Sequence, residues 1–401
     1  MPAHSSKVRL FRAVTLGHFG IDVFNSMGPV LLAFLQQPLG LSAAQVGLGV
    51  GVHQFLAGAT QPPFGWLTDR IGSRWLGPGS VLLTMTALCA SLWVVQRFGF
   101  WAFLPLFALA ALGSGAFHPQ GVMHSSDAVP GRAATTTSVF FLGGQLGLAA
   151  GPVLAGVVLD RLGLPGIWLL GLLFLPVPLY MATQMLPRAH NPLPVPTRRD
   201  ASAARGGWSA GPLTLLVAIF SGRAWIFIGT VAFLPLLFHG KGWSASAQGA
   251  VAGAFWLGGA VTGVLAGAFA DRVGRRLAVS ASTGLGALLL LLLPLADGPG
   301  AVVLSFLCGG ALGAPHSVLM VIAQDLLPVR RALASGLALG FLFAMGAIAS
   351  WTIGALADAF ALQPVLQGGA LVGAAVASLA LLLPRTAARG EVPAEQVSAV
   401  V

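Results

Sequence analysis

The sequence predicts an all-α membrane protein with twelve transmembrane helices in two parallel-repeat six-helix bundles, on three observations. The 401 residues are 56% hydrophobic and only 8% charged, whereas soluble domains carry about 25% charged residues. Apolar runs of about 20 residues recur along the chain, and each is long enough to cross a hydrocarbon core of about 30 Å. Features of the first half also recur in the second at a nearly constant spacing.

The expected helices are apolar runs separated by short polar, glycine- or proline-containing turns. They cover 13–36, 44–67, 75–96, 100–124, 134–159, 164–186, 212–238, 246–270, 277–296, 300–324, 333–358 and 363–385. Residues 187–211 are rich in proline, glycine and arginine and lack an apolar period, so we expect a linker there. The expected domains are therefore 1–186 and 212–401, the second with a short tail.

The basic residues predict the orientation, because loops rich in lysine and arginine stay in the cytoplasm. With the N-terminus inside, seventeen basic residues are cytoplasmic and three are external, and Arg223 lies within the membrane. We therefore expect both termini and the linker to be cytoplasmic. The external residues are Arg97, Arg161 and Lys241.

The two halves repeat each other in the same orientation. One match would be chance, but a series at nearly constant spacing indicates a parallel duplication, as in transporters whose halves rock about a midplane site. The matches are GWLTDRIGSRW at 65–75 with GAFADRVGRRL at 267–277 (offset 202), and His118 with His316, Asp127 with Asp325 and Asp160 with Asp358 (offset 198).

The stretch GHFGIDVFNSMGP at 17–29 places polar groups inside the first apolar helix. His18, Asp22 and Asn25 are spaced i, i+4, i+7 and therefore share one helical face. A charge at the bilayer centre costs about 2.5–3.5 kcal/mol on insertion scales and is by default functional.

Arg223 is a full charge within the apolar run of predicted helix 7, at an offset of 201 from Asp22. We expect the two side chains to face a central cavity from opposite halves. In this hypothesis Arg223 attracts an anionic substrate group while Asp22 takes up and releases the coupling proton. The alternative is an inert pair that fixes the halves together.

Further polar residues of predicted helices 2, 4 and 10 are expected to line the same cavity. His118 and His316 occupy equivalent positions, and histidine titrates near neutral pH. For His53, a structural hydrogen bond to a neighbouring helix is at least as good an explanation. The set is His53, Gln54, His118, Gln120, His124 and His316.

The repeated G-x-x-x-D-R-x-G-x-R loop resembles the motif of the major facilitator superfamily. Within it, the chain is similar to the fosmidomycin-resistance transporters of bacteria, through the polar first helix, QPPFGWLTDR at 61–70, FHP at 117–119, IFSGR at 219–223 and AQDLLPVRRALASG at 323–336. The resemblance implies the major facilitator fold and the bacterial inner membrane. The family pattern continues FHP with Glu, where this chain has Gln120.

In the resembling family the repeated loop is a latch that closes the cytoplasmic side in one state and breaks during transport. Its glycines allow tight turns, and its aspartate can sit on the positive N-terminal end of a neighbouring helix. The plain alternative is a solvated turn. The residues are Gly65, Asp69, Arg70, Gly72 and Arg74, then Gly267, Asp271, Arg272, Gly274 and Arg276.

Predicted helix 5 carries small residues at intervals that let membrane helices pack closely. Generic packing explains most such glycines. Nevertheless Gly147, Gly151, Pro152 and Gly156 resemble the helix-5 motif of proton-driven antiporters, where it implies a water-excluding seam against helix 8.

Other chemistry is not indicated. The net charge of +10 does not predict nucleic-acid binding, because the bases lie in short loops. The histidines match no metal-binding motif, and a Walker motif or a catalytic triad is absent from the sequence. We expect neither an enzyme nor a cofactor, but a proton gradient as the driving force.

We therefore expect a monomeric secondary transporter in the lipid bilayer, acting on a small-molecule substrate. The favoured function is proton-coupled export of a small anionic or amphiphilic compound, a drug or metabolite, by alternating access. One alternative is proton-linked uptake of an organic anion. The other is a non-transporting receptor or assembly partner, against which the two intact loop motifs argue.

Overall fold

Every regular element that the structure describes is a helix. The computed structural model describes residues 2–129, 131–187, 210–326 and 331–383. The first half contains α1 (Pro2–Ser26), α2 (Gly28–Leu39), α3 (Ala43–Ala59), α4 (Gln61–Ile71), α5 (Leu76–Phe98), α6 (Phe100–Ser126), α7 (Ala133–Leu162), α8 (Pro165–Phe174) and α9 (Pro176–Met185). The second contains α10 (Ala210–Ala224), the π-helical turn η2 (Trp225–Gly229), α11 (Thr230–Gly240), α12 (Ala245–Val273), α13 (Arg275–Leu292), the 3-10 turn η3 (Leu293–Leu295), α14 (Gly298–Gly313), α15 (Pro315–Leu326), α16 (Arg331–Phe360) and α17 (Leu362–Ala380).

Several expected helices are divided at proline, which removes a backbone donor and cannot continue a straight helix. Proline stands within the first two residues of α2, α4, α8, α9 and η3. The twelve expected ranges are helical over most of their described residues, some as two helices. Within the described residues, ten helices are long and apolar enough to cross a membrane, or eleven when the bent helix Ala245–Val273 is counted as one crossing.

The expected linker at 187–211 lies almost wholly outside the described residues, as does the C-terminal tail from residue 384. The domain boundaries at these segments therefore stay predictions.

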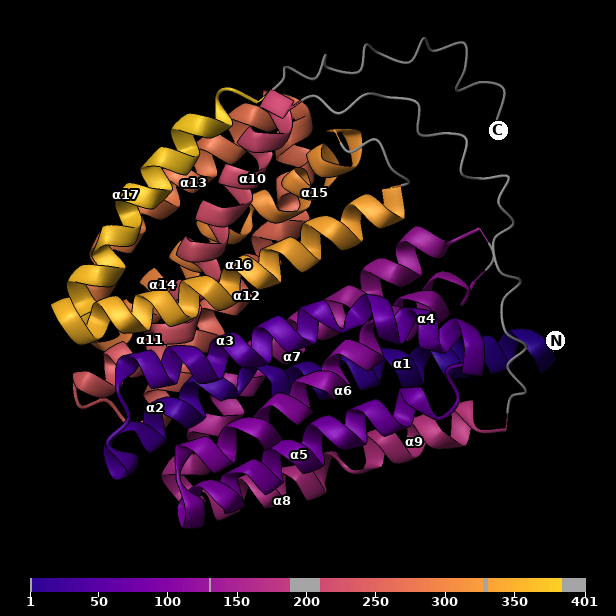
Figure 1. Cartoon of the computed structure of the whole chain (residues 1–401). Coiled ribbons are helices and arrows are strands. Elements are labelled where there is room, and N and C mark those ends of the chain that lie inside the picture. Colours follow the sequence, from indigo (N-terminus) through magenta and orange to yellow (C-terminus); the bar gives the residue numbers. More distant parts are fainter. Residues whose placement is uncertain (1, 130, 188–209, 327–330, 384–401) are drawn as a thin grey trace, which may run out of the picture.

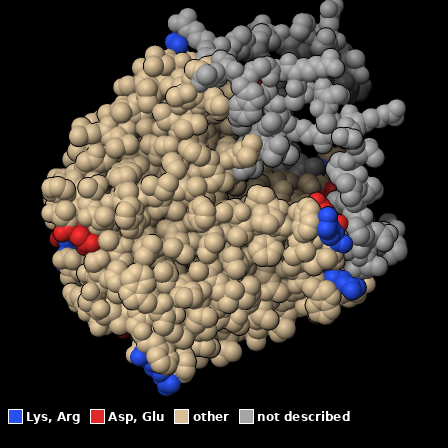
Figure 2. Space-filling view, in the orientation of Figure 1, with Lys and Arg blue, Asp and Glu red and all other residues tan. Residues whose placement is uncertain are grey.

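The outer surface is apolar. Large side chains such as Leu371, Leu173 and Phe360 are 78%, 71% and 68% exposed. In water each would forgo about 1.5–3 kcal/mol of burial energy, so this surface suits a bilayer. Figure 2 shows a face whose middle is free of charged groups, which lie at its margins.

The two halves meet at one end of the molecule and diverge toward the other (Figure 1). The main contacts between them are those of α2 with α11, α3 with α16 and α7 with α12. We call the joined end, where α3 and α12 begin, the closed end. The opposite end, with the N-terminus and the arginine-rich loops after α4 and α12, is called the basic end.

Glycines allow the joined helices to pack backbone to backbone. A Cβ atom at Gly47 or Gly51 of α3 would collide with the carbonyl of Ser350 or Ala347 on α16. The α7–α12 pair is built in the same way. Toward the basic end this close contact is lost, since a Cβ at Gly263 of α12 would meet nothing within 4 Å.

We expect Gly47→Ala to destabilise the protein by about 1–3 kcal/mol, because overpacking forces the α3 and α16 backbones apart. Gly340→Ala on α16, whose Cβ would meet nothing within 4 Å, is the matched control. It should be neutral or stabilising by up to about 1 kcal/mol through helix propensity. Thermal unfolding in detergent measures both, and equal effects would contradict the close contact.

Candidate functional site

The polar face of α1 is directed into the first half rather than toward lipid. His18 and Asp22 are 3% and 5% exposed, and α1 packs against α6 and α7. Small residues of α7 make room for the charged side chains, because a Cβ at Gly144 would collide with both His18 and Asp22. The local fold therefore depends on glycine beside the carboxylate.

Asp22 lies between two histidines, a group that we call the His–Asp–His cluster (His18, Asp22 and His118). His18 Nε2 lies 3.2 Å from Asp22 Oδ2, and His118 Nε2 lies 3.7 Å from Asp22 Oδ1. The Nδ1 atoms face backbone carbonyls, 2.8 Å from Phe140 O and 2.7 Å from Ser114 O. Both rings are thus fixed with Nε2 toward the carboxylate.

The hydrogens on the two rings decide whether these contacts are attractive. A carbonyl oxygen only accepts, so each Nδ1 must carry a hydrogen to be bonded. A neutral ring then presents its Nε2 lone pair to the carboxylate, which is repulsive unless a proton lies between them. One nitrogen of each ring and one carboxylate oxygen lie within 4.8 Å of one another. Among the described residues, no other three His, Cys, Asp or Glu side chains are so close together. A hydrogen on the Nε2 atom of either ring would therefore make its contact with the carboxylate attractive.

Asn25 and His53 extend the cluster toward the closed end. Asn25 Nδ2 donates to Asp22 Oδ1 and to Ser114 Oγ, both at 2.9 Å. Asn25 Oδ1 lies 3.4 Å from His53 Nε2, and His53 Nδ1 lies 3.2 Å from Phe107 O. His53 makes the structural bond to a neighbouring helix and also joins this network. Ser114 is a member that sequence reasoning missed, because serine is common in membrane helices and gives no signal of its own.

Aromatic packing encloses one side of the cluster and leaves the other accessible. The ring of Phe140 stacks on His18 at 4.0 Å between centroids, and Phe117 lies 5.9 Å from it. The His118 side chain is 21% exposed, against 8% for Asp22. The more accessible side of the cluster is therefore the side at His118.

Arg223 is a second buried charge, at the end of α10. It is 3% exposed, and its Nε has no hydrogen-bond partner. Its guanidinium lies 5.2 Å above the Phe227 ring, and within the described residues it makes no ion pair. His316 is close enough to interact with it electrostatically. The π-helical turn η2 begins two residues later, and such turns are frequent at functional sites.

Asp22 and Arg223 do not pair, and both side chains are buried in this structure. Each instead has the equivalent histidine of its own half nearby, His118 for Asp22 and His316 for Arg223. The inert ion pair that was the alternative is also not formed in this structure. A constant repeat offset predicts that two residues lie at equivalent depths in separate halves. Equivalent depth alone does not bring their side chains into contact.

The remaining predicted cavity residues lie outside the cluster. Gln120 is 1% exposed and donates through Nε2 to Ala116 O of its own helix at 2.9 Å. His124 Nε2 lies 2.7 Å from Ser73 Oγ, nearer the basic end, where it ties α6 to the loop after α4. Gln54 is half-buried on α3.

The repeated loops end α4 and α12 at glycines with positive φ, 79° at Gly72 and 89° at Gly274. L-residues rarely adopt this conformation, which explains glycine there. The other two glycines, Gly65 and Gly267, lie within helices and are not closely approached by a neighbouring helix. A Cβ at Gly65 would make only ordinary contact with Pro119, and one at Gly267 would meet nothing within 4 Å.

The expected latch at the basic end is not engaged in this structure. Asp69 and Asp271 are exposed, and neither makes an ion pair to a described residue. Arg70 stacks 3.9 Å above the Trp66 ring, and Arg276 Nη1 donates to Leu381 O at 3.4 Å. Arg74 and Arg272 are exposed.

The helix-5 motif packs on two helices rather than only on the predicted eighth. A Cβ at Gly147 or Gly151 of α7 would meet backbone carbonyls of α1. Gly156 faces α12, and Gly249 of α12 approaches the Pro152 carbonyl. Gly156 is five residues beyond Gly151, which turns it by roughly 140° around a helix of 3.6 residues per turn. The seam against α12 therefore uses Gly156 and Pro152.

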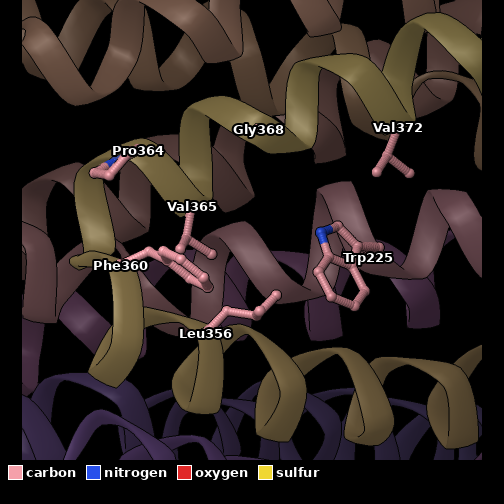
Figure 3. A pocket seen from close by; sticks show the side chains of 7 residues that line it. All are labelled: Trp225, Leu356, Phe360, Pro364, Val365, Gly368 and Val372. Atoms are coloured by element: carbon pink, nitrogen blue, oxygen red, sulfur yellow. The ribbon is translucent and has the colours of Figure 1, made fainter.

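A cavity of about 340 Å³ in the second half is unrelated to these charges. Figure 3 shows it between α16, α17 and η2. Apart from the indole of Trp225 its lining offers no polar side chain, so it provides no partner for a charged group. The lining residues are Trp225, Leu356, Phe360, Pro364, Val365, Gly368 and Val372.

A helical membrane protein with duplicated halves, joined at one end and each containing a buried charge, has the organisation of a secondary transporter. The family model described as Major Facilitator Superfamily matches residues 14–247 and 214–400. The chain belongs to the major facilitator superfamily.

Two curated proteins are similar over most of the chain. The fosmidomycin resistance protein of Escherichia coli (strain K12) is 28% identical over 369 residues, 88% of each chain. An uncharacterized MFS-type transporter of Bacillus subtilis (strain 168), YfnC, is 26% identical over 377 residues, 92% of this chain and 90% of the relative. The resemblance predicted from the sequence is confirmed.

Solved structures confirm the fold class. A bacterial homologue of the human lysosomal transporter Spinster, inward-facing and occupied, has a TM-score of 0.72 at 16% identity, covering 93% of this chain and 96% of that one. The nucleoside transporter NupG has a TM-score of 0.71 at 14% identity, covering 94% and 99%.

We expect Arg223→Met to stabilise the protein by about 1–3 kcal/mol, because it removes a buried polar group that has no partner. Arg275→Met is the control, since Arg275 has a partner in Asp325 at 2.7 Å and its loss should cost at most about 1 kcal/mol. Thermal unfolding compares the two variants. Destabilisation by Arg223→Met would contradict the absence of a compensating group.

Proposed function

We propose that the protein is a proton-coupled antiporter that exports a small anionic or amphiphilic compound by alternating access. It acts as a monomer in the inner membrane of a bacterium with both termini in the cytoplasm. The orientation is supported by the bias of seventeen basic residues against three. In that orientation the basic end faces the cytoplasm, and the compound enters there.

The Nε atom of Arg223, which is buried and has no hydrogen-bond partner, carries the proposal for an anionic group. A buried charge is retained when something compensates it, and within the described residues Arg223 has only the ring of Phe227 and the nearby His316. An anion supplies both the charge and the hydrogen-bond acceptors that the guanidinium lacks. We therefore assign the anionic group of the cargo to Arg223.

The His–Asp–His cluster supports proton coupling, because its contacts are favourable only with shared protons. Antiport requires that the cargo and the protons compete. A cargo whose hydrogen-bond donors reach Asp22 past the partly exposed His118 side chain would replace those protons. The name of the Escherichia coli relative, a resistance protein, supports export as the direction.

Proton-linked uptake of an organic anion is the second candidate, and charge balance favours it. With an anion on Arg223 and a proton on Asp22, the charges at the two sites sum to zero. Without cargo and proton, the opposite charges of Arg223 and Asp22 also sum to zero. The cargo and the proton would then travel together. Only the direction of the pH gradient that drives flux separates the two candidates.

Inside-out proteoliposomes decide between them, with fosmidomycin and then a panel of small organic anions as probes. We expect an acidic lumen to drive accumulation of the probe. We further expect Asp22→Asn to abolish that accumulation and to retain probe exchange without a gradient. Normal gradient-driven transport by Asp22→Asn would contradict the assignment of Asp22 as the proton site. Accumulation driven by an acidic exterior would instead establish proton-linked uptake.

Arg223→Gln should weaken probe binding about ten- to a hundred-fold, the loss of one hydrogen bond to a charged group worth about 1.5–3 kcal/mol. Arg223→Lys keeps the charge and should lose less. Calorimetric titration measures the dissociation constants, with Arg275→Gln, whose side chain pairs with Asp325 apart from both buried charges, as the control that retains binding. Equal affinity of wild type and Arg223→Gln would mean that the anionic group binds elsewhere.

A further inference from the structure

Two carboxylates at the closed end connect the halves, and they occupy equivalent positions of the repeat. Asp160, near the end of α7, accepts hydrogen bonds from the backbone N–H groups of Ala245 and Ser246 at 2.9 and 2.8 Å. Asp358, near the end of α16, accepts from Ala43 and Ala44 at 2.7 and 2.9 Å. Each carboxylate therefore binds the beginning of a helix in the other half.

These bonds complete the N-termini of α12 and α3. The first N–H groups of a helix have no partner within it and carry partial positive charge. Serine caps the third residue of each helix, since Ser244 Oγ accepts from Ala247 N and Ser42 Oγ accepts from Gln45 N. The first and second residues are capped by the carboxylate from the opposite half. The same capping arrangement occurs at α3 and at α12, and together the two form a joint between the halves.

A glycine four residues before each aspartate brings the helices close enough for this contact. A Cβ at Gly156 would collide with the Ala245 carbonyl, and one at Gly354 with the Ala43 carbonyl. Glycine and aspartate at i and i+4 lie on one face of the helix. The G-x-x-x-D pattern therefore has a physical reason in both halves.

We propose that Asp160 and Asp358 are functional residues of the transport cycle, a paired latch that holds the closed end shut until all four bonds break. Alternating access requires the closed end to open, and opening separates α7 from α12 and α3 from α16. Each latch then leaves a carboxylate and two N–H groups to water. The proposal depends on membership of the transporter superfamily and is independent of the cargo and the coupling ion.

The opening of the closed end can be measured directly by the distance between two spin labels. Gln37 in the last turn of α2 and Gly240 at the end of α11 are exposed and lie in opposite halves. Labels are attached after Gln37→Cys and Gly240→Cys. The native Cys89 and Cys308 are 3% and 0% exposed and do not compete. Pulsed electron spin resonance in lipid nanodiscs then gives the distance distribution.

We expect Asp160→Asn or Asp358→Asn alone to raise the ratio of long to short distances about tenfold, by losing charge-assisted bonds, and the double variant to raise it further. Asparagine is nearly isosteric, and gel filtration checks that each variant is folded. The single variants carry the test if the double variant does not fold.

Asp297→Asn is the matched control. Asp297 also lies at the closed end and loses the same charge, but its carboxylate accepts from Gly298 N and Trp243 Nε1 within the second half only. It should leave the distances unchanged. An unchanged distribution in the latch variants, or an equal shift in Asp297→Asn, would overturn the proposal. Neither outcome depends on which compound is transported.

Discussion

The bilayer cannot solvate charge, and this constraint governs the interior of the molecule. A buried charge must be compensated by protein groups, by protons or by a ligand. Asp22 receives two imidazoles and an amide from its own half, whereas Arg223 is left with an aromatic ring and a nearby histidine. The first half therefore compensates its buried charge with its own side chains, whereas Arg223 Nε in the second half has no hydrogen-bond partner.

The duplication explains how these unequal sites share one scaffold. His118 and His316 lie at equivalent positions, one beside an acid and the other near a base. Asp160 and Asp358 are equivalent in position and in chemistry. The repeat therefore preserved the joint between the halves and let the charges inside them diverge. The halves can rock against each other because their joint is symmetric. They can bind different groups because their buried charges differ.

Periodicity and the repeat predicted the helical ranges, the fold class and the polar face of α1 correctly, because apolar length and spacing are local properties. Contacts between helices were less predictable. The repeat of His118 as His316 placed His118 in the cavity. Its contact with Asp22, however, depends on the rotation of α6 against α1. Gly147 and Gly151 were assigned to the wrong neighbour for the same reason. Asp160 and Asp358 were recognised as a repeated pair, yet their partners are backbone groups that no motif reveals.

The crossed capping of α3 and α12 also bears on how the protein is assembled. The partners of Asp160 are 85 and 86 residues away along the chain, whereas those of Asp358 are 315 and 314 residues away. During synthesis the beginning of α12 meets its carboxylate soon after insertion. The beginning of α3 waits until α16 has been made. The closed end is therefore completed in two stages, and a truncated chain that ends before α16 would have only the first of its two joints.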